Sequence, residues 1–327
     1  MKKNLTEFKM GYGPMSIEII ELLTRYASLQ PLMLVASRNQ VDYQNAYVCN
    51  SSYLGQKISK NQNILLCRDH CGPYFKDTDK SLSLTDAILE CKKTIEHDIE
   101  AGFDLIHIDV SKVQDSFKIA DDLITFTLDL NPNIFLEFGS EENTGQNLDD
   151  TLSNLDKQLN YCQQYKDHIK FFVSQTGSFI KNKQLGKFDT RYNRYLSDKI
   201  HDAGFLFKEH NGDYLTKDEL TLRKLAGVDA INVAPQLGVI QTEVLLALSN
   251  DSAELQVFID KVYNGNKYQR WLNPKDYNDV MAATNVSGHY FFNTFEYKNL
   301  LNTINVNQFQ NDLEKKIFDC LDTYKEF

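Results

Sequence analysis

The chain has 327 residues, of which 42% are hydrophobic and 24% are charged, and its formal net charge is −10. This hydrophobic content is sufficient for a large core, so the composition indicates a folded globular protein. The acidic balance and the lack of clustered Lys and Arg argue against nucleic acid as a partner.

The N-terminus carries Lys2 and Lys3 but no apolar stretch behind them, so it does not have the pattern of a signal peptide. No run approaches the roughly 18 apolar residues that a membrane helix needs. The six cysteines lack a paired framework, which is typical of a reducing compartment. We therefore expect a cytoplasmic protein without membrane association.

Short apolar runs alternate with helical stretches along most of the chain. A weakly marked first strand at 9–16 precedes an amphipathic stretch, and further strands are predicted at 32–37, 63–69, 105–110, 133–139, 169–175, 205–210 and 228–233. Gly102, Gly204 and Gly227 support this phasing, because each lies between a predicted helix and the next strand. The pattern is typical of βα units around a parallel sheet.

Eight βα units in about 240 residues predict an α/β fold of the TIM (β/α)8 barrel type. We assign residues 1–250 to the barrel, with 241–248 as its eighth helix, and 251–327 to a mainly helical C-terminal extension packed on it. An amphipathic helix at 307–324 ends the chain. A doubly wound sheet is the alternative, but no glycine-rich nucleotide turn follows an early strand.

Polar side chains follow most of the predicted strands. The carboxyl ends of barrel strands form one face, where active sites of this fold lie, so we expect these side chains to meet. The residues are Asp69 and His70, Asp109 and Ser111, Glu141 and Glu142, Gln175, and Glu209 and His210.

Two of these residues, His70 and His210, are predicted metal ligands, because a neutral imidazole suits zinc and similar divalent ions. Glu141 or the Gln175 carbonyl would complete the site. The carboxylates of Asp69 and Asp109 are then left to orient the imidazoles or to act as acid and base.

Two further histidines are weaker candidates. His107 alternates with Asp109 on one strand face, so it could point into the barrel or be an ordinary core imidazole. His289 lies outside the barrel, and the C-terminal segment could bring it over the barrel mouth.

A phosphorylated substrate would need backbone N–H groups or a cation. Residues 175–178 and 211–212 could supply the first, and Arg38, Lys112, Lys187 and Arg191 could supply the second. These glycine-containing turns are equally well explained as tight turns at strand ends.

The strand-end motifs together resemble the non-catalytic subunit family of class II tagatose-bisphosphate aldolase, which includes ketose-6-phosphate C4 epimerases. The resemblance runs from about residue 39 to residue 248. It rests on Asn39-Gln40-Val41, Asp69-His70-Cys71-Gly72-Pro73, Ala101-Gly102-Phe103, His107-Ile108-Asp109-Val110-Ser111, Gly139-Ser140-Glu141, Gln175-Thr176-Gly177 and His210-Asn211-Gly212-Asp213-Tyr214.

This resemblance implies a class II aldolase-like barrel and a divalent metal, with Zn²⁺ expected. The residues it assigns fall into three groups: Asp69, Asp109 and Glu141 as catalytic, His70, His210, Gln175 and Glu141 at the metal, and Asn39, Gln40, Ser111 and Asn232 on substrate hydroxyls. The chain departs from true class II aldolases in two places, since Gln175 stands where a second His is expected and no Gly-Gly-Ser loop follows His210.

The function that we predict is a metal-dependent C4 epimerase of a ketose phosphate in carbohydrate metabolism. It would break and re-form the C3–C4 bond by retro-aldol and aldol chemistry through a metal-stabilised enediolate. The alternative is a non-catalytic, stabilising subunit of a tagatose-bisphosphate-type aldolase, or such an aldolase itself. The expected partners are a sugar or sugar phosphate, and either a second copy of the chain or a catalytic aldolase subunit.

Overall fold

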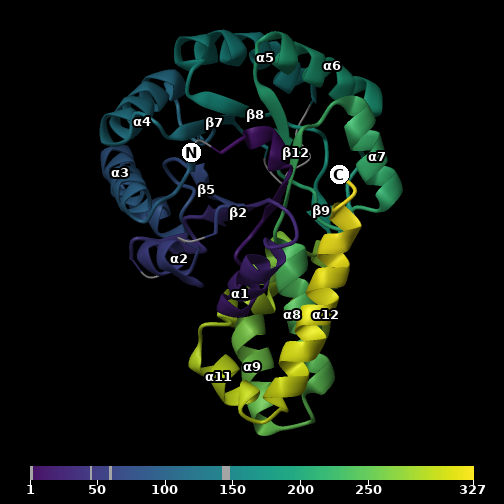
Figure 1. The fold of residues 1–327 in the computed structure, drawn as a ribbon. Helices are drawn as coiled ribbons and strands as arrows, with labels where there is room; N and C mark the ends of the chain where they lie inside the picture. The colour runs from purple at the N-terminus through teal and green to yellow at the C-terminus, as the bar shows by residue number, and fades with distance from the viewer. Residues whose placement is uncertain (1–2, 45, 59–60, 142–147) are drawn as a thin grey trace.

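Eight parallel strands close into a barrel in this computed structural model, which describes residues 3–44, 46–58, 61–141 and 148–327 (Figure 1). Each strand pairs with the next in chain order, and β1 pairs with β12 through Met10 and Ile231 to close the ring. The predicted TIM (β/α)8 barrel is therefore confirmed. Its strands are β1 (Met10–Tyr12), β2 (Leu32–Ser37), β5 (Ile64–Cys71), β6 (Leu105–Ile108), β7 (Phe135–Gly139), β8 (Ile169–Val173), β11 (Leu206–Glu209) and β12 (Ala230–Val233).

Helices connect these strands and surround the barrel (Figure 1). Gly102, Gly204 and Gly227 end three of them with φ of 87°, 88° and 83°, the left-handed conformation that glycine adopts most easily. The connecting helices are α1 (Ile17–Tyr26), α2 (Ser51–Ile58), α3 (Leu84–Glu100), α4 (Ser116–Leu130), α5 (Leu148–Cys162), α6 (Thr190–Asp202) and α7 (Lys217–Ala226). Helix α8 (Pro235–Leu248) follows the last strand, β12, and packs against α12 (Val306–Tyr324) and α10 (Val280–Ser287).

The inside of the barrel is apolar at the amino ends of the strands and polar above. Met33, Leu65, Leu105, Phe171 and Ala230 form the apolar layer, and Leu5 and Phe8 close it from below. Strand side chains alternate between faces, so the next inward positions on β6, β7 and β11 carry His107, Glu137 and Lys208. All three are buried.

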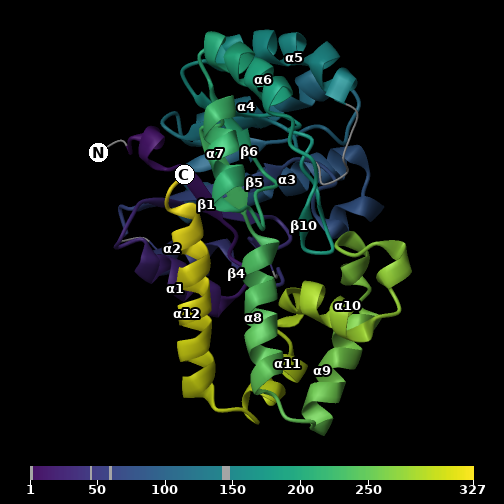
Figure 2. The same ribbon diagram turned by 90° about the vertical axis from the view of Figure 1, so that its right-hand side faces the viewer.

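The C-terminal helices are α9 (Ala253–Asn264), α10 (Val280–Ser287), α11 (Phe295–Leu301) and α12 (Val306–Tyr324). Helix α12 lies along α8 and also contacts α1 and α7 (Figure 2). Helices α9 and α11 lie with it beyond the barrel on one side (Figures 1 and 2). The division into units 1–250 and 251–327 stays a prediction. Among the described residues, no helix has both the length and the apolar character needed to cross a bilayer.

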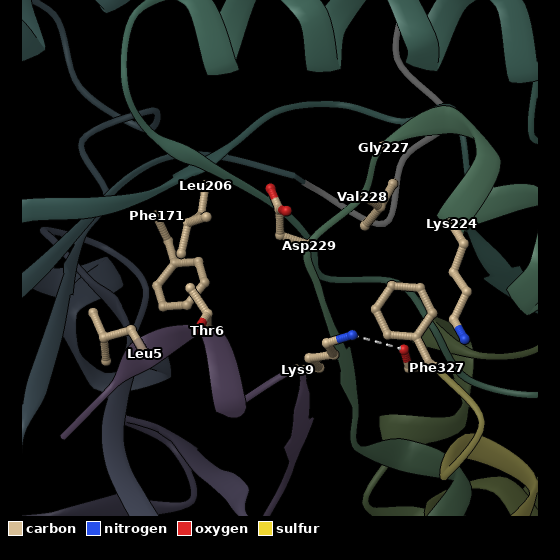
Figure 3. Close-up of a pocket in the computed structure, with 10 residues that line it drawn as sticks. All are labelled: Leu5, Thr6, Lys9, Phe171, Leu206, Lys224, Gly227, Val228, Asp229 and Phe327. Carbon is tan, nitrogen blue, oxygen red and sulfur yellow. Dashed lines mark hydrogen bonds between the residues drawn. The ribbon is translucent and has the colours of Figure 1, made fainter.

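A cavity of about 400 Å³ lies at the amino ends of the strands (Figure 3). Lys9 closes one side by donating a hydrogen bond to the Phe327 carbonyl oxygen, 3.3 Å away. Its lining includes Asp229 and Lys224 but no histidine. The polar residues singled out in the sequence lie at the opposite end of the barrel.

Gly139 should be much less tolerant of alanine than Gly102. Both have positive φ, but a Cβ on Gly139 would lie 2.0 Å from the Val173 carbonyl oxygen, whereas nothing lies within 4 Å of one on Gly102. We expect Gly139→Ala to lower the free energy of unfolding by about 3–5 kcal/mol and Gly102→Ala by about 1–2 kcal/mol. Urea denaturation measures both, and equal losses would show that the backbone at Gly139 moves to make room.

Candidate functional site

A bulge in β5 turns both Asp69 and His70 toward the barrel mouth. In a regular strand, consecutive side chains point to opposite faces. Here the register of β5 against β6 shifts between Arg68 and Cys71, and His70 has φ of 45°. A bulge with one residue in the left-handed region re-aims a side chain in this way, and such strained residues are common at functional sites.

His107 on β6 and His210, which follows β11, join this pair. The four residues Asp69, His70, His107 and His210 each offer one metal-ligating atom, and these atoms all lie within 4.8 Å of one another. The ring centroids of His70, His107 and His210 are 5.0–5.1 Å apart. We call these four residues the histidine cluster.

The remote ring nitrogen of each imidazole has a fixed acceptor. His70 Nδ1 lies 2.7 Å from Asp109 Oδ2, His210 Nε2 lies 2.7 Å from Glu137 Oε1, and His107 Nε2 lies 2.9 Å from the Gly139 carbonyl oxygen. Carboxylates and carbonyls only accept, so in the neutral imidazoles these nitrogens carry the hydrogen. The lone pairs therefore fall on His70 Nε2, His210 Nδ1 and His107 Nδ1.

These lone pairs and the Asp69 carboxylate face one another. His70 Nε2 and His210 Nδ1 are 3.4 Å apart, and Asp69 Oδ1 is 3.6 Å from both His210 Nδ1 and His107 Nδ1. His107 Nδ1 also accepts a hydrogen bond from the backbone N–H of His70 at 3.2 Å. Several electron-pair donors therefore converge on one point, which favours a proton or a cation between them.

The electrostatic field of the cluster keeps its acids ionised. Burial alone would raise the pKa of Asp69, but His70, His210 and His107 hold it well below its usual value. Asp109 behaves in the same way, because His70 lowers its pKa against the effect of burial. Burial lowers the pKa of His210. For His107 burial opposes protonation, yet Glu137, Asp69 and Asp109 raise the pKa to about 9.

Glu137 connects the cluster to the barrel interior. Its Oε2 accepts a hydrogen bond from Lys208 Nζ at 2.7 Å, and both side chains are 1% exposed. Burial would raise the pKa of Glu137, but Lys208 and the two neighbouring histidines hold it far below its usual value. A permanently charged carboxylate is thus available to orient His210.

Glu141 lies beside the cluster but is engaged by other groups. Its carboxylate accepts hydrogen bonds from the backbone N–H and hydroxyl of Thr176 and from the backbone N–H of His210, the last at 2.6 Å. Burial and the nearby Glu209 charge raise the pKa of Glu141 to about 8. Glu209 itself pairs with the buried Arg223 at 2.6 Å. Glu141 is therefore an acid that can change protonation near neutral pH.

The histidine cluster opens into a cavity of about 430 Å³ at the carboxyl ends of the strands. Of the catalytic, metal-binding and substrate-binding residues predicted from the sequence, the cavity is lined by Asn39, Gln40, Asp69, His70, Glu141, His210 and Asn232, and the weaker candidates Arg38, Lys112 and His289 also line it. Asp109 is not part of this lining and instead contacts His70 from behind. Ser111 and Gln175 are also outside the lining, and Glu142 falls outside the described residues.

Two of the residues predicted to bind substrate, Asn39 and Asn232, differ in whether their side-chain amides already form hydrogen bonds. Asn39 donates to the Phe75 carbonyl and accepts from the N–H of Asp77, both at 3.0 Å. Both amide atoms of Asn232, in contrast, are buried without a hydrogen-bond partner in the described part of the chain. Gly11 leaves the space for it, since a Cβ there would lie 2.2 Å from Asn232 Oδ1. Of these two residues, only Asn232 has an amide whose hydrogen-bonding capacity is unused by the described residues.

The C-terminal helix supports the loop that follows His210. The Tyr324 hydroxyl lies 3.0 Å from the Gly212 carbonyl oxygen, 2.7 Å from Gln236 Oε1 and 3.2 Å from the Leu215 nitrogen. Helix α12 thus fixes the backbone next to His210, although it lies at the far end of the sequence.

Sequence reasoning gave His107 little weight and missed Glu137 and Lys208. All three interrupt apolar strands at inward positions, in Leu-Ile-His-Ile, Phe-Leu-Glu-Phe and Leu-Phe-Lys-Glu. The signal that could have revealed the Glu137–Lys208 ion pair is one acidic and one basic residue, each replacing an apolar residue in a different buried strand.

Fold and site together define a TIM-barrel protein with a potential metal-binding cluster at its carboxyl-end mouth. No protein-family profile matches the chain, and no curated protein matches its sequence. Its fold is similar to that of a probable tagatose 6 phosphate kinase from Sinorhizobium meliloti 1021, with a TM-score of 0.73 and 17% identity over 90% of this chain and 86% of that chain. It is also similar to a fructose-bisphosphate aldolase from Campylobacter jejuni, with a TM-score of 0.54 and 12% identity over 91% of both chains.

At these identities the likeness establishes the fold alone. The tagatose-bisphosphate aldolase subunit family that the motifs resemble stays a prediction.

Arg223 should be essential for holding Glu209 and Glu141 side by side. Arg223→Met leaves a buried carboxylate without its counter-ion, so we expect the free energy of unfolding to fall by about 3–5 kcal/mol. A carboxyl group whose pKa is higher in the folded than in the unfolded protein stabilises the folded state fully at pH below the unfolded pKa. This stabilisation is lost as the pH rises through the folded pKa, which is about 8 for Glu141. The loss in Arg223→Met should therefore be larger at pH 9 than at pH 6.

Arg194→Met is the matched control, because Arg194 forms an exposed pair with Asp198 at 3.1 Å. Exposed pairs of this kind contribute at most about 0.5 kcal/mol. Denaturation of both variants at the two pH values measures the difference, and a pH-independent loss in Arg223→Met would contradict the role given to Glu141.

Proposed function

We propose that this protein is an enzyme that epimerises a ketose or ketose phosphate at C4, with a divalent metal ion bound at the histidine cluster. The observation that carries the proposal is the convergence of Asp69, His70, His107 and His210, the first two and the last of which line a cavity at the active end of a TIM barrel.

The donor set fits a metal. Zinc–nitrogen bonds of about 2.0–2.1 Å place neighbouring tetrahedral ligands about 3.3 Å apart. The separation of 3.4 Å between His70 Nε2 and His210 Nδ1 is close to this value. Each ring also donates its other N–H to an acceptor, the arrangement usual for metal-binding histidines. We assign His70 and His210 as ligands, with Asp69 completing the set, or His107 if the cation displaces the proton that its raised pKa favours.

An ion at this position would supply a Lewis acid for the ketose carbonyl oxygen. The chain supplies the proton transfers. Glu141 suits this role because it borders the cavity and its pKa of about 8 lets it both accept and return a proton. Asp69 is the second candidate, and Asn232 would hold a sugar hydroxyl with its unpaired amide.

Epimerisation requires that the aldehyde fragment formed by C3–C4 cleavage rotates in the site. The enediolate then attacks the other face of the aldehyde before the fragment leaves. The C-terminal segment supports retention, because Trp271, His289 and Tyr290 border the cavity from outside the barrel, together with Tyr47. If the same residues cleaved the C3–C4 bond but the aldehyde fragment left the site, the enzyme would be an aldolase. The fold neighbours described as an aldolase and a probable tagatose 6 phosphate kinase support a sugar phosphate as the substrate class.

The purified chain supplied with zinc should interconvert fructose 6-phosphate and tagatose 6-phosphate, and NMR spectroscopy of the sugar signals measures this. We expect Glu141→Gln to lower kcat by about 10²–10⁴, the usual loss of a general acid–base group. Glu243→Gln, which removes an exposed carboxylate paired with Lys183, should leave it unchanged.

Triose formation without C4 inversion would identify an aldolase instead. If the chain turned over no ketose but raised the activity of an added catalytic aldolase, the non-catalytic subunit would be the correct alternative.

Metal content gives a test that does not depend on turnover. Purified without chelator, the chain should contain about one divalent ion, and His210→Ala should lose most of it, because three protein ligands are the usual minimum for tight zinc binding. His201→Ala is the control, since His201 pairs with Asp229 outside the cluster. Elemental analysis decides, and a wild-type protein that takes up no zinc would contradict the assignment.

A further inference from the structure

The outer wall of the cavity comes from segments outside the barrel strands. One is the hairpin of β9 (Ile180–Lys181) and β10 (Gln184–Leu185), and the others are two 3-10 turns, η4 (Lys267–Arg270) and η6 (Gly288–Phe291). Lys181 Nζ joins hairpin and η4 by donating to the carbonyl oxygens of Gln269 and Arg270 at 3.3 and 2.7 Å.

We propose that Lys181, Arg270 and His289 form a subsite on this wall for the terminal anionic group of the substrate, a phosphate or a carboxylate. The proposal rests on the proposed function of the same cavity and narrows its substrate class to sugars that carry an anion at the end remote from the histidine cluster.

His289 is the most specific part of this subsite. It is fully buried and lines the cavity, yet neither ring nitrogen has a hydrogen-bond partner among the described residues. Buried polar atoms in native proteins are nearly always paired, so an imidazole in a cavity wall without a protein partner can hydrogen-bond a group that enters the cavity. The fold reserves its place, because a Cβ on Gly238 would lie 2.6 Å from the His289 Cβ.

Burial and Arg270 lower the pKa of His289 to about 3, so near neutral pH the ring is neutral and offers one N–H. That N–H can donate a hydrogen bond to an anionic oxygen while the imidazole itself stays uncharged. The ring is held in position by Tyr290, whose centroid is 4.2 Å away.

Arg270 supplies a guanidinium that forms no ion pair or hydrogen bond within the described part of the chain. Its nearest aromatic contact is Trp271, with 5.2 Å between the guanidinium carbon and the ring centroid. A guanidinium binds phosphate or carboxylate through two parallel hydrogen bonds. Burial and Arg270 also lower the pKa of Lys181, so the two cations repel each other and an anion between them would relieve that repulsion.

The nearby carboxylate does not neutralise this wall. Asp77 also lines the cavity, but Lys80 and Lys267 already pair with it at 2.8 and 2.6 Å. The floor of the cavity, in contrast, carries the Asp69 carboxylate. This difference in charge would orient an anionic ketose with its carbonyl at the histidine cluster and its anion at the rim.

The cations that sequence reasoning considered for phosphate do not form this subsite. Arg38 is buried and pairs with Asp79 at 2.5 Å, and Lys187 and Arg191 are not part of the cavity lining. Lys112 lines the cavity nearer to His70, with its ammonium 3.8 Å from the Phe75 ring centroid.

Trp271 provides a direct test, because it is the only tryptophan of the chain and lines the cavity beside Arg270. Its fluorescence should respond to inorganic phosphate, fructose 6-phosphate and a ketohexuronate in saturable titrations of the full-length protein, and far less to fructose. Arg270→Gln, Lys181→Gln and His289→Phe should each weaken binding of the anionic ligands about tenfold or more, as expected for a lost charge-assisted hydrogen bond.

Lys183→Gln is the matched control, since Lys183 lies on the same hairpin turn but pairs with Glu243 at 2.6 Å and does not line the cavity. Arg270 contacts the Trp271 ring, so the Arg270→Gln substitution can change the fluorescence signal itself. Binding to this variant should therefore also be measured by calorimetry. Tighter binding of the phosphate ester or of the uronate identifies the anion, and either result supports the subsite. Equal affinity for fructose and the anions, or equal weakening by Lys183→Gln, overturns it.

Binding is measured without turnover, so the two proposals fail separately. Variant-dependent anion binding without conversion of any ketose would leave the subsite standing and reject the proposed epimerase. Conversion of neutral ketoses by a protein that does not bind anions would leave the proposed epimerase standing and reject the anion subsite.

Discussion

The buried Glu137 carboxylate is the interaction on which the candidate site depends. One oxygen binds Lys208 and the other binds His210, each at 2.7 Å. A charge buried inside a barrel needs a partner of opposite sign, and Lys208 on β11 supplies it. Because Glu137 stays ionised, it accepts a hydrogen bond from His210 Nε2–H, which leaves the Nδ1 lone pair facing His70. An ion pair in the barrel interior therefore decides which nitrogen faces the cavity.

The cavity has two chemically different ends. Its floor consists of imidazoles and carboxylates from the strand ends, and its rim carries Lys181 and Arg270 from segments outside the barrel strands. The extension beyond residue 250 contributes to both. It supplies Arg270 and His289 to the wall, and Tyr324 on α12 holds the loop after His210. The C-terminal helices are thus part of the site as well as a cover for the apolar face of α8.

Much of the fold could be predicted from the sequence, because each strand is a short apolar run and the left-handed glycines 102, 204 and 227 mark helix ends. The pairing of Asp69-His70 with His210 followed from their positions at strand ends. The orientation of His70 did not, since it depends on a bulge defined by pairing between β5 and β6. His107 was given little weight, and Glu137 and Lys208 were not predicted, because a single polar residue in an apolar strand does not show by itself that it has a partner across the barrel.

The sequence alone determined the order of the βα units and the chemical types at their ends, since apolar periodicity and helix-ending glycines act locally. The tertiary structure decided which of those residues meet. Asp109 turned out to lie behind His70 instead of in the cavity, and Glu141 to bind Thr176 and the His210 backbone. Barrel closure brings β11 to face β5, β6 and β7, and the packing of the C-terminal segment on α8 sets His289 at the cavity. Contacts between residues so distant in sequence depend on the packing of the whole chain, which no local pattern encodes.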